Sequence, residues 1–331
     1  MVGTYRTHVS GVGSYLPERI LSNFDLEKMV DTNHQWIVER TGIEKRHLTK
    51  EGEVTSDIAF FAAQKALKAA NLTAQDLDMI IVATVSGDQV MPSTACVLQH
   101  KLQCRNIMAF DLTAACSGFV YALSVADQFI RTGMYKHILV VGAEILHNLV
   151  NYQDRETCIL FGDGAGAWIA SRADQSEKHI VYSSHLHSDG GLGDLFVLPG
   201  GGSKIPFSQE VLDNKQNYVV MKGREIFKNA VRTLANCCEE ALEANNMTIE
   251  QVDWLVPHQA NKRILEAVCD QLKFPKEKMI VSLHETGNTS AASIPLAFGL
   301  AVEEGKIQRG QTVLLAAFGA GLTSGSVLLR Y

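Results

Sequence analysis

One cysteine in this sequence stands where a strand-like segment gives way to a helical pattern. The stretch "FDLTAACSGF" (residues 110–119) places Cys116 after the apolar segment "NIMAFDLTAA", which predicts a strand. Beyond it apolar residues recur every three or four positions, which predicts a helix ending near Gly133. Unpaired N–H groups at a helix start lower the pKa of a thiol and favour the reactive thiolate. The competing interpretation is a buried structural cysteine in a tight turn, and the local pattern does not decide between the two.

Two further polar residues follow predicted strands. His258, in "LVPHQANKRI", stands between a strand and a helix, and Asn288, in "HETGNTSAASIP", is expected in the equivalent loop of the next unit. Sites in α/β sheets collect at the carboxyl ends of strands, so both residues are predicted to approach Cys116. Taken singly, each residue has a simpler interpretation. His258 would be a structural histidine whose hydrogen bonds are made within the protein, and Asn288 a loop residue bonded to its own backbone.

The elements that would position these residues form a pattern that occurs twice. Strands alternate with helices in both halves, and the Gly-rich turn of "FGDGAGAWIAS" returns as "FGAGLTSGSVLL". This predicts two similar layered halves, residues 1–173 and 174–331, divided at the polar stretch "RADQSEK". Residues 199–217, "PGGGSKIPFSQEVLDNKQN", are expected to form a surface loop.

Composition narrows the class of protein. The chain has 331 residues, 46% hydrophobic and 20% charged, as in globular proteins, and its net charge of −6 argues against general nucleic-acid binding. No apolar run reaches the ~18 residues of a membrane span, and no apolar signal core opens the chain, so a cytoplasmic protein is expected. None of the seven cysteines forms a Cys-x-x-Cys pair, and His185, His187 and Asp189 are weak evidence for a metal, so no metal site is predicted. No Gly-rich segment fits a phosphate-binding loop.

Together, "DLTAACSGF", "HQANKRI" and "GNTSAASIP" resemble the three signatures of the beta-ketoacyl-acyl carrier protein synthase III family, the initiating condensing enzymes of bacterial fatty acid synthesis. "DTNHQWIVERTGIEKRH" and the C-terminal "FGAGLTSGSVLLRY" extend the resemblance over essentially the whole chain. It implies an α/β thiolase-like fold, with two similar βαβαβαββ halves in an α-β-α-β-α arrangement, and a homodimer.

The resemblance also implies a reaction. An acyl group passes from acyl-CoA to Cys116, and the carbanion formed by decarboxylation of malonyl-acyl carrier protein then attacks it. His258 and Asn288 would donate hydrogen bonds to the enolate oxygen, and the backbone N–H groups of Cys116 and Ala320 would form a second oxyanion hole. Residue 320 is alanine where the family often has glycine. Acyl-CoA is a substrate, and no permanently bound cofactor is implied.

Other positions take roles only from the resemblance. Around coenzyme A it places Trp36, Arg40, Arg155, Met221, Gly223 and Asn261. For docking of the acidic carrier it suggests Arg263, Lys262, Arg224 and Lys228. Met91 stands where better-known members carry an aromatic residue that reaches across the dimer to close the acyl pocket. A surface tryptophan and a solvated basic helix face are the simpler interpretations of Trp36 and of the four basic residues.

Several relatives of this family remain as alternatives. A degradative thiolase needs a second cysteine in the C-terminal turn, which "FGAGLTSG" lacks. An elongating condensing enzyme carries histidine where Asn288 stands, although His284 is only four residues away. Type III polyketide synthases are usually longer, with different flanking motifs. A specialised paralogue with unusual acyl groups stays open, as does, with less support, a noncatalytic carrier-binding scaffold, and the sequence leaves the primer undefined.

Overall fold

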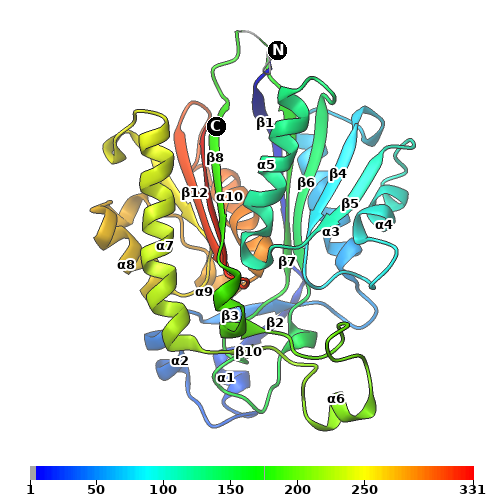
Figure 1. Cartoon of the computed structure of the whole chain (residues 1–331), viewed down its shortest axis with the longest axis vertical. Helices are drawn as coiled ribbons and strands as arrows, with labels where there is room; N and C mark the ends of the chain where they lie inside the picture. The colour runs from blue at the N-terminus through cyan, green and yellow to red at the C-terminus, as the bar shows by residue number, and fades with distance from the viewer. Residues whose placement is uncertain (1–4, 175) are drawn as a thin grey trace.

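The computed structural model describes residues 5–174 and 176–331, and two β-sheets dominate it (Figure 1). All strands of the first sheet come from the first half of the chain. In spatial order they are β1 (Thr7–Tyr15), β7 (Gly164–Arg172), β6 (His137–Glu144), β4 (Met79–Ala83) and β5 (Met108–Leu112). β4 runs parallel to β5 and β6, whereas β7 is antiparallel to β1 and β6.

The second sheet repeats this order with strands of the second half. They are β8 (Val181–Ser188), β13 (Thr323–Arg330), β12 (Thr312–Gly319) and β11 (Trp254–Pro257). Strand directions match as well, since β11 is parallel to β12 and β13 is antiparallel to both of its neighbours. The counterpart of β5 is reduced to a single bridge between Leu255 and Met279. The expectation that a sheet strand precedes Asn288 is therefore wrong, because a short helix, α9 (Leu283–Thr286), occupies that place.

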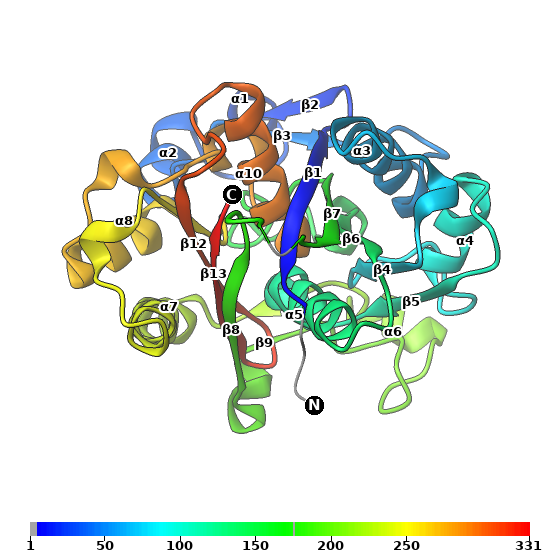
Figure 2. The ribbon, with the colours of Figure 1, turned by 90° about the horizontal axis from the view of Figure 1, so that it is seen from above.

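Helices cover both faces of both sheets. α5 (Gly118–Arg131) and α10 (Ser293–Glu303) lie between the sheets, where their side chains share one core cluster with both (Figure 2). α3 (Thr55–Ala69) and α4 (Thr94–Lys101) cover the outer face of the first sheet, and α7 (Gly223–Ala244) and α8 (Lys262–Leu272) that of the second. This α-β-α-β-α layering confirms the predicted fold class.

The sequence explains which helices are central. α10, "SIPLAFGLAVE", buries eight of its eleven residues, as expected of a helix that is apolar on all sides. In contrast, α7 and α8 carry one apolar stripe each, which packs on the second sheet, and their charged faces are exposed. A helix sandwiched between two sheets needs the first composition and an outer helix the second.

Short elements complete the chain. The remaining strands are β2 (Arg19–Ser22), β3 (Lys45–Leu48), β9 (Phe196–Val197) and β10 (Val220–Met221), and the remaining α-helices are α1 (Asn23–Leu26), α2 (His34–Thr41) and α6 (Gln209–Asp213). The 3₁₀ turns are η1 (Ala74–Asp76), η2 (Ala115–Ser117), η3 (His147–Leu149), η4 (Gly190–Leu195), η5 (Ile249–Gln251), η6 (Lys276–Lys278) and η7 (Ser290–Ala292). The predicted surface loop 199–217 thus contains one helix, α6. Among the described residues, no helix combines the length and apolar character needed to cross a bilayer.

Candidate active site

Cys116 lies in the turn η2 between β5 and α5, as the sequence predicts, and only 6% of the residue is exposed. Gly319, the last residue of β12, packs directly against this turn. A Cβ atom at position 319 would stand 2.7 Å from the Cys116 nitrogen and 3.1 Å from the Cys116 Cβ. The Gly-rich C-terminal segment of one half therefore reaches the cysteine of the other half because a side chain is absent at its closest point.

The protonation of Cys116 differs from the prediction. Burial raises the pKa of the Cys116 thiol to about 12, although the Ser290 hydroxyl acts in the opposite direction; nearby Glu144 raises the pKa further. The expected lowering of this pKa is therefore wrong for the free chain, because desolvation of the thiolate outweighs the N-terminal position. The thiol of the free chain is therefore protonated at neutral pH.

A cavity of about 120 Å³ opens beside the cysteine. This is roughly the volume of four water molecules in the liquid, enough for a short acyl chain. Its polar lining consists of Cys116, Ser290 and the backbone of Ala320, and the rest is mainly apolar. The apolar lining residues are Val85, Ala115, Leu146, Leu149, Val150, Phe161, Phe196, Val197, Leu198 and Val219.

His258 follows β11 and is held from two sides. Its backbone N–H donates to the Ala316 carbonyl on β12 (2.8 Å), and its ring Nδ1 lies 2.6 Å from the Ser293 Oγ. Burial lowers the pKa of His258 to about 3. The imidazole is therefore neutral at physiological pH, the state required of an uncharged hydrogen-bond donor.

Asn288 is fixed by its backbone and by one end of its amide. Its N–H donates to the Leu160 carbonyl (2.8 Å), and its own carbonyl accepts from the Gly162 N–H (3.1 Å). Its Oδ1 accepts from the Ser290 N–H (2.9 Å), whereas its Nδ2 makes no hydrogen bond within the part of the chain that the structure describes. The amide group thus presents a free donor.

One short segment draws the three predicted residues together. Residues 288–293 carry Asn288 itself, Ser290 beside Cys116 in the cavity, and Ser293 against the His258 ring. The backbone of β12 supports the same cluster, since it bonds His258 at Ala316 and reaches the cysteine turn at Gly319. The three loops are thus linked through residues 288–293, although neither His258 nor Asn288 lines the cavity and no sheet strand precedes Asn288.

Ala320 lines the cavity, and its φ is not positive. An alanine therefore stands at this position without backbone strain, and its N–H group remains available as a donor.

Three of the residues assigned to coenzyme A gather on the surface. The Arg40 guanidinium lies 4.8 Å and the Arg155 guanidinium 5.3 Å from the centre of the Trp36 ring. Asn261 lies close by but uses both ends of its amide within the protein, accepting from the Arg263 N–H and donating to the Arg40 carbonyl.

Met221 and Gly223 lie elsewhere, where β10 passes into α7, and neither lines the cavity, although neighbouring Val219 does.

The basic residues lie where the prediction expects. Arg224 and Lys228 are exposed on the first turns of α7, and Lys262 and Arg263 on the first turn of α8. The Arg263 guanidinium stands 5.8 Å from the Phe227 ring of α7, so the two helix starts form one surface. Met91, in contrast, is 82% exposed and does not line the cavity of its own chain.

Three residues of this region escaped the sequence reasoning: Glu144, Ser290 and the Ser293 that contacts His258. The Glu144 carboxyl, at the end of β6, is fully buried; its Oε2 accepts from the Val85 N–H (3.1 Å) and the Ser86 hydroxyl (2.5 Å), and burial raises its pKa. The sequence signal that could have indicated a buried carboxyl group was the glutamate at the end of the apolar run "HILVVGAE". Ser290 adopts a φ of +47°, uncommon for a residue with a side chain, and nothing in the composition of "TSAAS" indicates this.

The weak metal candidate does not assemble. His185 and His187 both face Glu240, with His187 Nε2 only 2.6 Å from its Oε2, while the Asp189 carboxylate accepts from the Gly191 N–H. Within residues 5–174 and 176–331 no group of three potential ligands is placed to hold a metal.

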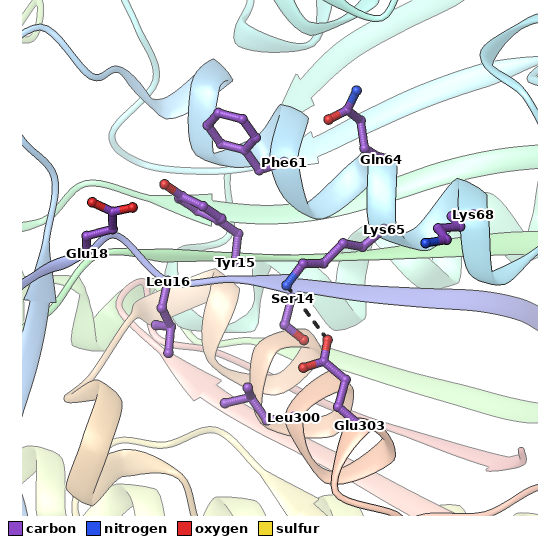
Figure 3. A pocket seen from close by; sticks show the side chains of 10 residues that line it. All are labelled: Ser14, Tyr15, Leu16, Glu18, Phe61, Gln64, Lys65, Lys68, Leu300 and Glu303. Atoms are coloured by element: carbon purple, nitrogen blue, oxygen red, sulfur yellow. Dashed lines mark ion pairs between the residues drawn. The ribbon is translucent and has the colours of Figure 1, made fainter.

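A larger, open hollow of about 590 Å³ lies between β1, α3 and α10 (Figure 3). The rings of Tyr15 and Phe61 lie there in a tilted pair with their centroids 4.8 Å apart, and Lys65 faces Glu303 at 4.0 Å. None of its lining residues belongs to the predicted site.

The paired sheets, the two central helices and a buried cysteine at the start of one of them define a condensing enzyme of the thiolase-like class. Two sequence models described as 3-oxoacyl-[acyl-carrier-protein (ACP)] synthase III match the chain, one over residues 110–190 and one, for the C-terminal part, over residues 242–331. The chain belongs to the 3-oxoacyl-[acyl-carrier-protein] synthase III family, which confirms the predicted family and makes it an acyltransferase.

Individual relatives agree along the whole length. The chain is 51% identical over 329 residues to beta-ketoacyl-[acyl-carrier-protein] synthase III of Thiobacillus denitrificans, covering 98% of this chain and 99% of the relative. It is 46% identical over 332 residues to the enzyme of the same name from Koribacter versatilis, covering 100% and 99%. The crystal structure of 3-oxoacyl-[acyl-carrier-protein] synthase III from Aquifex aeolicus has a TM-score of 0.91 and 46% identity, covering 98% of this chain and 100% of that one.

Proposed function

We propose that this chain condenses an acyl-CoA primer with malonyl-acyl carrier protein, releasing CO2 and coenzyme A and giving a 3-oxoacyl-acyl carrier protein, the first condensation of fatty acid synthesis. The observation that carries the proposal is the segment 288–293, in which Asn288 is fixed through the Ser290 N–H, Ser290 lines the cavity together with Cys116, and Ser293 holds the ring of the neutral His258.

In the first half-reaction the Cys116 sulfur attacks the thioester carbonyl of acyl-CoA. A new C–S bond forms to Cys116, the bond to coenzyme A breaks, and the proton lost by the cysteine leaves with the coenzyme A thiol. The N–H groups of Cys116 and Ala320 stabilise the oxyanion between these steps. Because burial raises the pKa of the free thiol, the cysteine must lose its proton in the course of this half-reaction.

In the second half-reaction malonyl-acyl carrier protein loses CO2, and negative charge develops on its thioester oxygen. His258 and Asn288 supply two uncharged donors to this oxygen, and the low pKa of His258 keeps its ring from becoming a permanent cation. The carbanion then attacks the acyl carbonyl on Cys116, and the cysteine sulfur departs.

The substrates are proposed to bind at two surfaces. Trp36 and Arg155 would hold the adenine of coenzyme A between them, with Arg40 at the nucleotide and Met221, Gly223 and Asn261 nearer the pantetheine. A flat ring between them needs about 7 Å, twice an ordinary contact distance, so the Arg155 guanidinium must move outward from its 5.3 Å position. Arg263, Lys262, Arg224 and Lys228 form the surface proposed for the acidic carrier.

A homodimer is proposed from the open edge of the first sheet. β5 is the outermost strand on that side, and an edge strand needs a cover. Exposed apolar side chains surround it, among them Met108 (42% exposed), Met134 (64%) and Met91 (82%). A second copy on this edge would place Met91 at the partner's cavity. Light scattering should give twice the mass of one chain.

The division into units 1–173 and 174–331, with Cys116 on one and His258 and Asn288 on the other, also stays a proposal, as does a cytoplasmic location without nucleic-acid partners. The two sheets support the division, because each takes its strands from one side of it.

Separate assays of the two half-reactions test the proposed chemistry. In Cys116→Ala, acyl transfer from acyl-CoA should vanish while decarboxylation of malonyl-carrier persists. In Asn288→Ala, the acyl-enzyme should still form but condensation should fall about 10²–10³-fold, the cost of one oxyanion donor. His258→Ala should also lose decarboxylation. Intact-protein mass spectrometry follows acylation, and labelled CO2 follows decarboxylation. Normal acylation of Cys116→Ala would show that the nucleophile is another residue.

A further inference from the structure

The two ring nitrogens of His258 have different surroundings. Nδ1 lies 2.6 Å from the hydroxyl oxygen of Ser293. Ser293 is the first residue of α10, and only 1% of this serine is exposed. Nε2 makes no hydrogen bond to any described residue of the chain. The ring therefore rests on Ser293 through one nitrogen and has the other free for a ligand.

A second contact fixes the direction of the Ser293 hydrogen bond. The backbone N–H of Gln259 points at the same hydroxyl oxygen at 3.4 Å. This N–H can only donate, so it occupies one of the two lone pairs of the oxygen, and the hydroxyl proton can then be donated to His258 Nδ1. If Nδ1 carried a proton instead, both groups would donate to Ser293, and its buried hydroxyl proton would need an acceptor that the described bonds do not provide.

Gln259 is itself immobilised, which keeps this arrangement in place. Its Nε2 donates to the Pro257 carbonyl (2.7 Å) and the Ile280 carbonyl (3.2 Å), and its Oε1 accepts from the Ser282 N–H (2.9 Å). These bonds connect the peptide after His258 to residues 280–282, which follow the single bridge at Met279 where the first sheet has its fifth strand.

We propose that Ser293 is a positioning residue that fixes the tautomer of His258, with Nδ1 unprotonated and the proton on Nε2 facing the substrate. This inference rests on the proposed function, because it explains how a neutral imidazole presents a donor rather than a lone pair to the enolate oxygen. Without the Ser293 hydroxyl, both tautomers become accessible, and the one with a bare Nε2 repels the developing charge.

The experiment uses the full-length protein with ¹⁵N-labelled histidine, and NMR identifies the protonated ring nitrogen of His258. Ser293→Ala removes the hydroxyl and Ser293→Thr keeps it. Ser326→Ala is the matched control, since Ser326 is equally buried and its hydroxyl donates to the Cys237 carbonyl at 2.7 Å rather than to the His258 ring. Each variant is also tested for melting temperature, Cys116 acylation and decarboxylation of malonyl-carrier.

We expect the wild-type ring to be protonated at Nε2 alone, and Ser293→Ala to populate the other tautomer. Decarboxylation should fall about 10- to 100-fold in Ser293→Ala, corresponding to one unsatisfied buried group, with acylation much less affected. Ser293→Thr should restore most of the rate, and Ser326→Ala should lower the melting temperature without changing the tautomer.

A proton on Nδ1 in the wild type would overturn the proposal, even if Ser293→Ala failed to fold. So would a Ser293→Ala variant with an unchanged tautomer, or one whose rate falls only as far as that of Ser326→Ala. If the wild-type protein did not condense the substrates at all, the proposed function would fail, whereas the NMR measurement would still decide the role of Ser293.

Discussion

Replacing Gly319 with alanine tests whether the close approach of β12 positions the reactive turn. The added Cβ would stand 2.7 Å from the Cys116 nitrogen and 3.0 Å from the Ser117 nitrogen, where ordinary contact begins at 3.4 Å. Both neighbours are backbone atoms, which cannot rotate away as the end of a flexible side chain can. The turn must therefore retreat by about 0.7 Å, or β12 must bend by a similar amount.

The magnitude follows from this displacement. Overpacking of this kind costs about 1–3 kcal/mol of folding free energy, so the variant should fold but melt a few degrees earlier. A shift approaching 1 Å in a reacting group lowers its rate by roughly 10²-fold, so acylation of Cys116 should fall about 10- to 100-fold. Decarboxylation of malonyl-carrier should fall less, because Gly319 does not contact His258 or Asn288.

Mass spectrometry of the intact protein, sampled over time after addition of acyl-CoA, measures the acylation rate. Gly202→Ala is the control, because position 202 is exposed and a Cβ there meets no atom within 4 Å. A folded Gly319→Ala variant that acylates as fast as wild type would refute the reasoning, since it would show that the cysteine turn tolerates the added methyl group.

Four further outcomes are expected. Since burial raises the Cys116 pKa to about 12, its alkylation by iodoacetamide in the free protein should accelerate about tenfold per pH unit from pH 7 to 10, and a plateau below pH 8 would contradict this. Burial lowers the His258 pKa from 6.5 to about 3, so the unfolded chain takes up this proton first as pH falls. Below about pH 6.5, His258 should therefore lower the free energy of unfolding by up to about 1.4 kcal/mol per pH unit. In denaturant titrations, the free energy of unfolding of His258→Gln should fall less steeply with decreasing pH than that of the wild type. Arg263→Glu should raise the apparent KM for malonyl-carrier, most at low salt, with acylation by acyl-CoA little changed, and equal damage to both steps would count against a docking role. Primers longer than acetyl should be accepted, and a strict acetyl preference that persists in Met91→Phe would contradict the pocket assignment of Met91.

The sequence predicted the fold because its local signals and its repeat agree. Apolar periods mark the helices, the recurring Gly-rich turn marks two similar layered halves, and the family resemblance implies the α-β-α-β-α arrangement. Predicting the missing fifth strand of the second sheet was beyond local reasoning, because "MIVSLHETGN" contains a plausible strand start and only tertiary packing limits it to one bridge at Met279.

The site was predictable in its members but not in its energetics. Cys116, His258 and Asn288 were proposed as site residues from their loop positions and from the family resemblance of their motifs. The pKa of Cys116 was predicted in the wrong direction, because burial depends on the cavity walls, which come from eight separate segments of the chain. Ser290 and Ser293 were overlooked for a related reason. The role of a serine depends on which group its hydroxyl contacts in the fold, here the Cys116 thiol for Ser290 and the His258 imidazole for Ser293.

The bonds between Asn288 and residues 160–162 have a consequence for how the protein loses activity. They join the loop carrying the donor amide to the half that carries the cysteine, and Phe161 also forms part of the cavity wall. A fluctuation that separates the halves, even briefly and without melting either sheet, opens the cavity and removes the donor in one event. If Asn288 is the proposed donor, we therefore expect a local opening at these bonds to disturb the cavity wall and the donor together, so that activity is lost before either sheet melts.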